Sequence, residues 1–518
     1  MAGGLFVAGL WTMFRGALHG SSIGDNSDGG IVLAILEHWV RVFTGQAADW
    51  RSPGWYWPAP HALGLSDSLF LLAVPYAVAR AMGAGWFAAS DIALGTMATA
   101  GFWGMVLLVR RLGGAVAIGA VVAFVFSFGV VPEFKLGHAQ TYTMQLAPVM
   151  GLLLLAAWRR GSLWWAGAAG LLFGLMLFTA AQTPWFLGLE AGAALLAAVV
   201  LAGRRVEWRR GVRLVPGFGV GLAIGMVPFV ALYRASFGLR RDFSAAHFYS
   251  GRPLDLFNIP PGEVMWFEVL HRIGIAGNAA RPMAELALGL TPVLAIAAVV
   301  ALVLMVRQGV PAVGALLAAG VLGPLVAIDW GGVEPWKLVF WLVPGGNAVR
   351  TPFRIELAAQ FFLCLGLGLA LSRGMVRGGM VRAGLVGLMV LLVAEQVGEK
   401  PSGRDDAPMA AWLGAARRPG FACEAFYLVP GGGRAGGTGP WHQYQSDAMM
   451  LSERIGMPTV NGNSSFYPEG WNMPFTDKPD YAGKALAWID AHGVRDRVCG
   501  ADPRRGLWVE GVGPLEAR

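Results

Sequence analysis

Two aspartates that lie three residues apart follow the first apolar run of the chain, in the sequence GDNSDGG at 24–30. Two carboxylates this close together could serve as a general base and its partner, or bind a divalent cation through their oxygens. An Asp-Asn-Ser-Asp stretch before an apolar run is also typical of a helix start with an N-cap. The spacing makes Asp25 and Asp28 candidate catalytic residues and leaves the capping interpretation open.

Arginines near two later apolar runs are candidate phosphate ligands. Arg350 and Arg354 are four residues apart and would share one face of a helix that begins near Arg350. The planar guanidinium group matches the geometry of a phosphate group. An ion pair with Glu356, or attachment to lipid headgroups, would explain the same two arginines. Arg240 and Arg241 are alternative phosphate ligands.

Glu37 and His38 lie in GGIVLAILEHWVRVFTG at 29–45, whose main apolar residues share one helical face. Such a pattern suits a helix that lies on the membrane surface. The two polar side chains could orient the aspartates and bind substrate, or only belong to the polar side of this helix, and the structural role is favoured. Three tryptophans and a tyrosine at 50–57 are of the type found in interfacial aromatic belts.

The elements that must position these residues belong to a membrane protein. The chain has 518 residues, of which 55% are hydrophobic and 14% charged, and its mean hydropathy is +0.54. An ordinary soluble protein carries about 25% charged residues, so a set of soluble domains is excluded. Recurrent apolar runs, about 20 residues long like a spanning helix, also exclude disorder. We predict an all-α polytopic membrane protein with about eleven transmembrane helices.

Eleven apolar runs are the predicted spans: 1–20, 86–109, 112–131, 141–157, 163–181, 184–203, 214–236, 284–306, 310–328, 353–372 and 383–399. The segment 66–82 is short and contains Pro75, so we interpret it as re-entrant or interfacial. With this choice every short Arg-rich loop falls on one side, which is normally the cytoplasmic side. The N-terminus is then cytoplasmic, and most acidic residues lie toward the outer face.

The polar tail at 400–518 is predicted to be a small extracytoplasmic α/β domain, distinct from a transmembrane domain at 1–399 with its long outer loop at 20–85. Strands are expected at 426–430 and 506–510, and helices at 443–456 and 481–492. Cys423 and Cys499 lie close to the expected strands. An oxidising compartment would favour a disulfide between them, and two unrelated buried thiols are the alternative.

The chain resembles the polytopic GT-C-type membrane glycosyltransferases, and within them poorly characterised bacterial members related to the YfhO-like group. The motifs that carry the resemblance are GDNSD, LEHW, WRSP and YWPAPHALGLSD in the first outer loop, LGHAQ at 136–140, NAVRTPFR at 347–354 and NGNSSFYPEGW at 461–471. The resemblance implies transfer of a sugar from a polyprenyl-phosphate or pyrophosphate carrier at the outer leaflet. It also implies that an acidic residue of the first outer loop acts as base or metal ligand.

Carried over by position, Asp25 matches the acidic residue that closes the first span, and Asp28 is its neighbour. His138 and Gln140 match the polar group of the second outer loop, although a histidine in a loop is more often satisfied by the loop itself. The chain has no clear DxD or WWD signature, which puts an oligosaccharyltransferase-like, metal-dependent mechanism in doubt.

We therefore predict an inverting, lipid-linked-sugar glycosyltransferase of a bacterial cytoplasmic membrane, acting on the extracytoplasmic side of that membrane on a glycan or lipid acceptor. No cofactor is expected, a divalent cation stays possible, and nothing in the sequence points to nucleic acid. A transport or scaffold component for lipid or polysaccharide is the alternative, but it would need a polar path that the apolar centres of the spans do not supply. An O-antigen ligase or polymerase is a further possibility.

Overall fold

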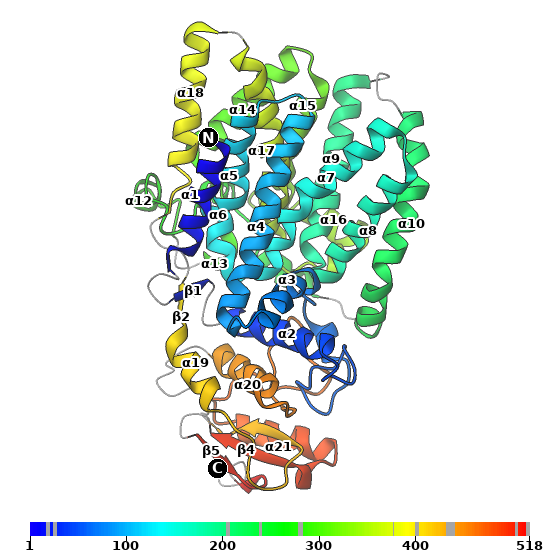
Figure 1. The fold of residues 1–518 in the computed structure, drawn as a ribbon, viewed down its shortest axis with the longest axis vertical. Coiled ribbons are helices and arrows are strands. Elements are labelled where there is room, and N and C mark those ends of the chain that lie inside the picture. The colour runs from blue at the N-terminus through cyan, green and yellow to red at the C-terminus, as the bar shows by residue number, and fades with distance from the viewer. Residues whose placement is uncertain are drawn as a thin grey trace.

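The computed structural model describes residues 1–16, 21–23, 28–203, 208–237, 241–277, 283–376, 378–398, 403–430, 441–502 and 506–513. Within these ranges the chain is mostly helical, and the long helices run side by side along the longest axis of the molecule (Figure 1). Six helical stretches are long and apolar enough to cross a membrane: Trp86–Arg111, Val116–Gly137, Ala139–Arg160, Gln182–Ala202, Trp208–Ser236 and Pro352–Met375. The chain thus has the features of an integral membrane protein.

Each of the eleven predicted spans coincides with a helix in the described ranges. They are α1 (Ala2–Phe14), α4 (Trp86–Arg111), α5 (Val116–Phe128), α7 (Ala147–Arg160), α8 (Leu163–Thr179), α9 (Gln182–Ala202), α10 (Trp208–Tyr233), α14 (Pro292–Arg307), α15 (Pro311–Leu322), α17 (Ile355–Met375) and α18 (Gly379–Ala394). The segment interpreted as interfacial contains the 12-residue helix α3 (Phe70–Ala81) with Pro75 inside it. Which of the shorter helices cross the bilayer, and in which direction, stays a prediction.

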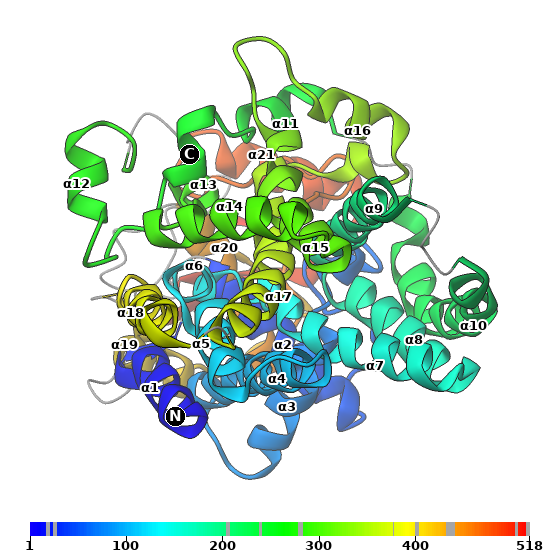
Figure 2. The ribbon, with the colours of Figure 1, turned by 90° about the horizontal axis from the view of Figure 1, so that it is seen from above.

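Helix α17 is the centre of the bundle. Every residue from Ile355 to Leu371 is buried, and the view from above shows α5, α14 and α15 packed around this helix (Figure 2). A helix that is apolar on all sides is expected to be buried in this way. Pro352 opens the short 3-10 helix η10 (Pro352–Arg354) that leads directly into α17, and proline suits a first turn because it needs no backbone donor there.

Helices α8 and α10 approach each other so closely that only glycine fits between them. A Cβ atom on Gly221 would lie 1.8 Å from the carbonyl oxygen of Gly167, and one on Gly170 would lie 2.0 Å from that of Phe218. Small residues at spaced positions are the usual means by which apolar helices pack in a membrane. The close contact explains why these two helices form a tightly joined pair at the side of the bundle.

The tail has the predicted α/β character. Its sheet has the order β3 (Ala425–Leu428), β4 (Val498–Asp502), β5 (Leu507–Val509), with β3 parallel and β5 antiparallel to β4. Three helices accompany the sheet, namely α19 (Asp406–Ala415), α20 (Trp441–Ile455) and α21 (Tyr481–Ala491). Cys423 and Cys499 form a disulfide, as predicted. Strand β4 and helix α19 were not predicted.

Helix α2 (Asp28–Phe43) lies between the bundle and the tail (Figure 1). The sequence predicted this helix correctly, but its polar side is covered by α20 of the tail rather than by water. The Arg41 guanidinium contacts the buried Glu453 carboxylate of α20 at 3.1 Å. Strand β1 (Ser21–Ile23) also pairs with β2 (Gly403–Asp405), which leads into the tail. Both contacts join the tail to the long loop that follows α1.

The aromatic residues at 50–57, which are of the type found in interfacial belts, are part of this junction. Trp55 and Tyr56 are almost completely buried. The Tyr56 hydroxyl hydrogen-bonds to the Ser464 hydroxyl in the tail, and the Trp488 indole donates to the carbonyl oxygen of Trp57 at 2.9 Å. Their apolar surface is covered by protein because the tail folds back onto the loop.

Candidate functional site

A cluster of ionisable side chains from four separate parts of the chain lies where α2, α17 and the loop before α7 meet. At its centre is Glu285, in the short helix α13 (Met283–Leu286). The Arg354 guanidinium holds the carboxylate with two nitrogens, one of them Nε at 2.7 Å. The Lys135 ammonium contacts the same carboxylate at 3.4 Å. All three side chains are buried, so one carboxylate and two cationic side chains interact here away from solvent.

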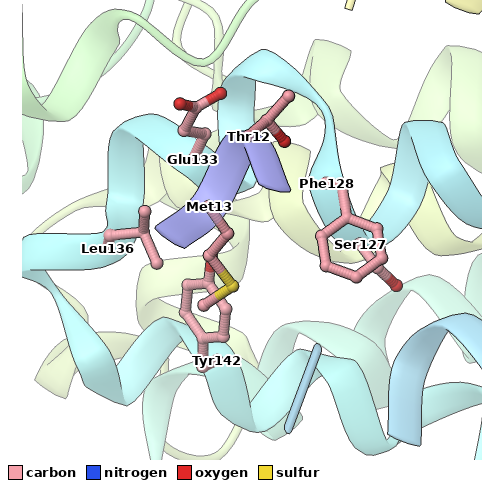
Figure 3. Close-up of a pocket in the computed structure, with 7 residues that line it drawn as sticks. All are labelled: Thr12, Met13, Ser127, Phe128, Glu133, Leu136 and Tyr142. Atoms are coloured by element: carbon pink, nitrogen blue, oxygen red, sulfur yellow. The ribbon is translucent and has the colours of Figure 1, made fainter. Parts of the chain in front are cut away.

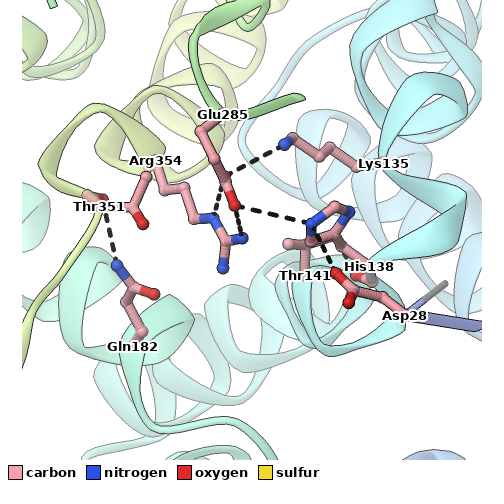
Figure 4. A network of polar contacts seen from close by, with 8 residues as sticks. All are labelled: Asp28, Lys135, His138, Thr141, Gln182, Glu285, Thr351 and Arg354. Atoms are coloured by element: carbon pink, nitrogen blue, oxygen red, sulfur yellow. Dashed lines mark hydrogen bonds and ion pairs between the residues drawn. The ribbon is translucent and has the colours of Figure 1, made fainter. Parts of the chain in front are cut away.

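Asp28 and His138 form the more accessible side of the cluster. The Nε2 atom of His138 lies 3.1 Å from the Asp28 carboxylate and 3.6 Å from Glu285 (Figure 4). The Asp28 side chain is 39% exposed, whereas that of Glu285 is 8% exposed. Asp28 is thus the more solvent-accessible carboxylate of this network, and His138 connects it to the buried charges.

Local backbone structure fixes these positions. Asp28 is the first residue of α2, where an acidic side chain is stabilised by the positive end of the helix dipole. His138 separates the 3-10 helices η3 (Lys135–Gly137) and η4 (Ala139–Leu146), and its carbonyl oxygen accepts a hydrogen bond from the Thr141 hydroxyl at 2.8 Å. Arg354 caps the start of α17. The Gln182 amide donates to the carbonyl oxygen of Thr351, which ties this turn to α9.

The two buried cations keep Glu285 ionised. Burial alone would raise the pKa of Glu285, but the charges of Arg354 and Lys135 hold it well below its ordinary value. A second carboxyl, Asp67, is electrostatically coupled to Arg354 and behaves differently. Burial raises the pKa of Asp67 to about 6, although Arg354 and a hydrogen bond from the backbone of Ala181 oppose this shift. The environment of Arg354 thus shifts the pKa values of these two carboxyl groups in opposite directions.

Three of the predicted site residues come together in this cluster: Asp28, His138 and Arg354. Gln140 is half-buried at the start of η4, two residues beyond His138. Asp25 and Arg240 lie outside the described residues. Arg354 does not stand free as a phosphate ligand, because Glu285 already occupies its guanidinium. The predicted alternative partner, Glu356, is buried in α17.

Glu37 and His38 are placed in structural contacts rather than beside Asp28. The Glu37 carboxylate accepts hydrogen bonds from the Tyr76 hydroxyl and from Arg80 Nε, the latter at 2.6 Å, which fastens α2 to α3. The Nε2 atom of His38 is 2.8 Å from the carbonyl oxygen of Trp50. These contacts support the structural interpretation of both residues that the sequence favoured.

Arg241 and Arg350 lie at a second place, next to the tail. Arg241 donates to the carbonyl oxygens of Ala348 and Ser465, and its guanidinium lies 4.2 Å from the ring centre of Phe466. Arg350 lies over the ring of Tyr249 at 5.3 Å. The structure therefore separates Arg350 from Arg354, which the sequence expected to act together.

Sequence reasoning missed the roles of Lys135, Glu285 and Asp67. Lys135 stands three residues before His138 in PEFKLGHAQ, and a lysine in that apolar setting was a usable signal because only five lysines occur in the chain. Asp67 ends the motif YWPAPHALGLSD. Nothing near Glu285 in the sequence shows that it meets Lys135, which is 150 positions away.

The described part of the cluster does not have the donor set of a metal site. No group of three or more His, Cys, Asp or Glu side chains among the described residues is arranged to hold a metal ion. Asp28, His138 and Glu285 come nearest to one. The Glu285 oxygens are already bound by Arg354 and Lys135, and these positive charges would repel a divalent cation.

A small cavity lies behind the cluster, beside α1 (Figure 3). It is lined by Thr12, Met13, Ser127, Phe128, Glu133, Leu136 and Tyr142. Its volume of about 10 Å³ is close to the minimum that holds one water molecule. The Glu133 carboxylate beside it contacts Arg15 at 3.4 Å. This cavity is too small for a sugar and belongs to the packing of the bundle.

The fold is similar to that of a solved sugar-transferring membrane protein. The mycobacterial arabinofuranosyltransferase AftD superposes with a TM-score of 0.54 at 16% identity, over 89% of this chain and 31% of that one, and its mutant R1389S with a TM-score of 0.52. The oligosaccharyltransferase AglB of Archaeoglobus fulgidus, solved with an inhibitory peptide and a dolichol-phosphate, gives only 0.49 at 12% identity, over 96% of this chain and 69% of that one. The chain thus spans about a third of the length of AftD. No protein-family model and no curated protein matches the sequence.

Proposed function

We propose that this protein transfers a sugar from a polyprenyl-phosphate-linked donor to an acceptor outside the cytoplasmic membrane, with inversion at the anomeric carbon. The observation that carries the proposal is the accessible Asp28 carboxylate held by His138 at the edge of a buried ion network. The GT-C-like fold supports the same reaction class. So do the loop motifs that resemble the YfhO-like bacterial members.

Asp28 would act as the general base. Its carboxylate removes the proton from an acceptor hydroxyl while that oxygen attacks the anomeric carbon. The bond between the anomeric carbon and the phosphate oxygen breaks, and the electron pair leaves with the polyprenyl phosphate. Because attack and departure take place on opposite faces of the sugar, the configuration inverts. Asp25 lies three residues earlier and stays an alternative base.

The charges behind Asp28 favour the departing phosphate. Arg354 and Lys135 carry two positive charges, while Glu285 carries one negative charge. When Asp28 has taken up the proton it becomes neutral, and the four groups together have a net charge of +1. Positive charge fixed in place before the reaction stabilises an anion that develops during it. His138 would position the Asp28 carboxylate through their contact.

The test is turnover of lipid-linked sugars by purified protein, followed as release of polyprenyl phosphate by mass spectrometry. Asp28→Asn should lower the rate by about 100-fold or more, the usual contribution of a general base. Asp49→Asn is the matched control, because Asp49 belongs to the same loop but pairs with Arg51. Asp25→Asn is measured in parallel. Full turnover by the Asp28→Asn variant would refute the assignment of the base to Asp28.

A further inference from the structure

A second concentration of positive charge lies between the outer loops and the tail. Arg241 follows α10, Arg350 precedes α17, and the tail contributes the loop that contains Phe466 and Tyr467. Arg241 donates to the carbonyl oxygen of Ala348, two residues before Arg350, and burial together with the charge of Arg350 lowers the pKa of Arg241 to about 10. Like charges held near each other repel, and a bound anion would relieve that repulsion.

No ion pair offsets it within the described ranges. Arg241 donates to carbonyl oxygens and stacks on Phe466, and Arg350 lies over Tyr249 with its side chain exposed to solvent. Arg354 differs from these two arginines, because its guanidinium donates two hydrogen bonds to the Glu285 carboxylate. Paired arginines with free donors are the arrangement that binds carboxylate or phosphate groups.

Aromatic rings adjoin these arginines. Tyr467 is partly exposed and stacks on Trp471 with 4.8 Å between ring centres. Burial raises the pKa of the Tyr467 phenol group, and the positive charge of Arg350 opposes this rise. An exposed ring with a polar tip can cover the apolar face of a sugar and hydrogen-bond to its edge. Binding sites commonly combine such rings with a few charged groups.

We infer that Arg241 and Arg350, together with Phe466 and Tyr467 of the tail, bind an acidic acceptor glycan through a carboxylate or phosphate group on one of its sugars. The inference rests on the proposed function and adds an acceptor class to it. The tail supplies one wall of this site, so it takes part in acceptor binding. A donor phosphate could offer the same chemistry, and the experiment separates the two sources.

Binding to the full-length protein in detergent tests the inference, with tetragalacturonate as the acidic probe and maltotetraose as its neutral counterpart. Arg350→Gln should weaken tetragalacturonate binding by about tenfold or more, the effect expected for one lost charge-assisted contact. Arg272→Gln removes an equally exposed arginine that pairs with Glu268 elsewhere, and it should bind as the wild type does. Binding should also weaken as salt is raised.

Undecaprenyl phosphate is the third probe. Its affinity should be the same in the wild type and in Arg350→Gln. If that variant instead loses undecaprenyl phosphate and keeps tetragalacturonate, the site serves the donor and the inference is wrong. Equal binding of the acidic and neutral tetrasaccharides, or no binding of either, also overturns it. The Asp28→Asn variant should bind tetragalacturonate normally, so failure of the catalytic assignment and failure of this site are distinguishable.

Discussion

Replacement of Glu285 by glutamine would remove the negative charge on which the buried network depends. The side chain keeps its size, but Arg354 and Lys135 would be left without a counter-charge in a site where the three side chains are at most 10% exposed. Removing one partner of a buried ion pair typically costs about 3–5 kcal/mol, because the remaining charge is desolvated and uncompensated. We expect a loss of stability in this range.

The loss would be measured as the shift in the unfolding transition of the purified protein in detergent. Glu268→Gln is the matched control, because Glu268 is 65% exposed and pairs with Arg272 one helical turn away. An exposed pair of this kind contributes about 0.3–0.5 kcal/mol. Asp28→Asn should also leave stability nearly unchanged, since Asp28 is the accessible member of the cluster. If Glu285→Gln is as stable as Glu268→Gln, the network is not the ion-paired support described above.

Two further predictions concern packing and pH. Gly221→Leu should destabilise the protein by about 1–3 kcal/mol or more, because its side chain would strike the backbone of α8, whereas Gly219→Ala on the same helix has free space and should be neutral. Burial raises the pKa of Glu453 to about 8 and lowers that of His38 to about 4. Above about pH 7.5 His38 is neutral in almost every molecule of both states, so the fall in stability as the pH rises to about 8 comes from Glu453, which loses its proton. Glu453→Gln should abolish this fall, and a thermal-unfolding series from pH 6.5 to 8.5 would show whether it does.

Much of the fold follows from local sequence. Apolar runs of spanning length mark the bundle helices, and the strand at 426–430 and the helix at 481–492 were recognisable from residue type and from Gly493, which has the positive φ of 63° typical of a helix end. Strand β4 was missed because VCGAD is short and has no clear alternation. The pattern of one segment does not show which other segment will cover it.

Because a local pattern does not reveal distant partners, only part of the site could be predicted from the sequence. Asp28 was a candidate because of its spacing to Asp25, Arg354 because of its spacing to Arg350, and His138 because of the resemblance of LGHAQ to a family motif. Glu285 was visible only as one acid among several, since its partners come from distant parts of the chain. The same holds for α2, whose polar side suits water by sequence but meets α20. Long-range packing, which the sequence does not display, decided both cases.

The position of Asp28 at one end of α2 has a mechanical consequence. The other end of this helix contacts the tail through the ion pair of Arg41 with Glu453. With a rise of 1.5 Å per residue, the 13 residues between Asp28 and Arg41 make a lever about 20 Å long, and a tilt of about 5° at the tail would swing the carboxylate by about 2 Å. Displacements of 1 Å can slow a reaction by about two orders of magnitude. For the base proposed at Asp28, the position of the tail would therefore decide where the carboxylate at the far end of the helix lies.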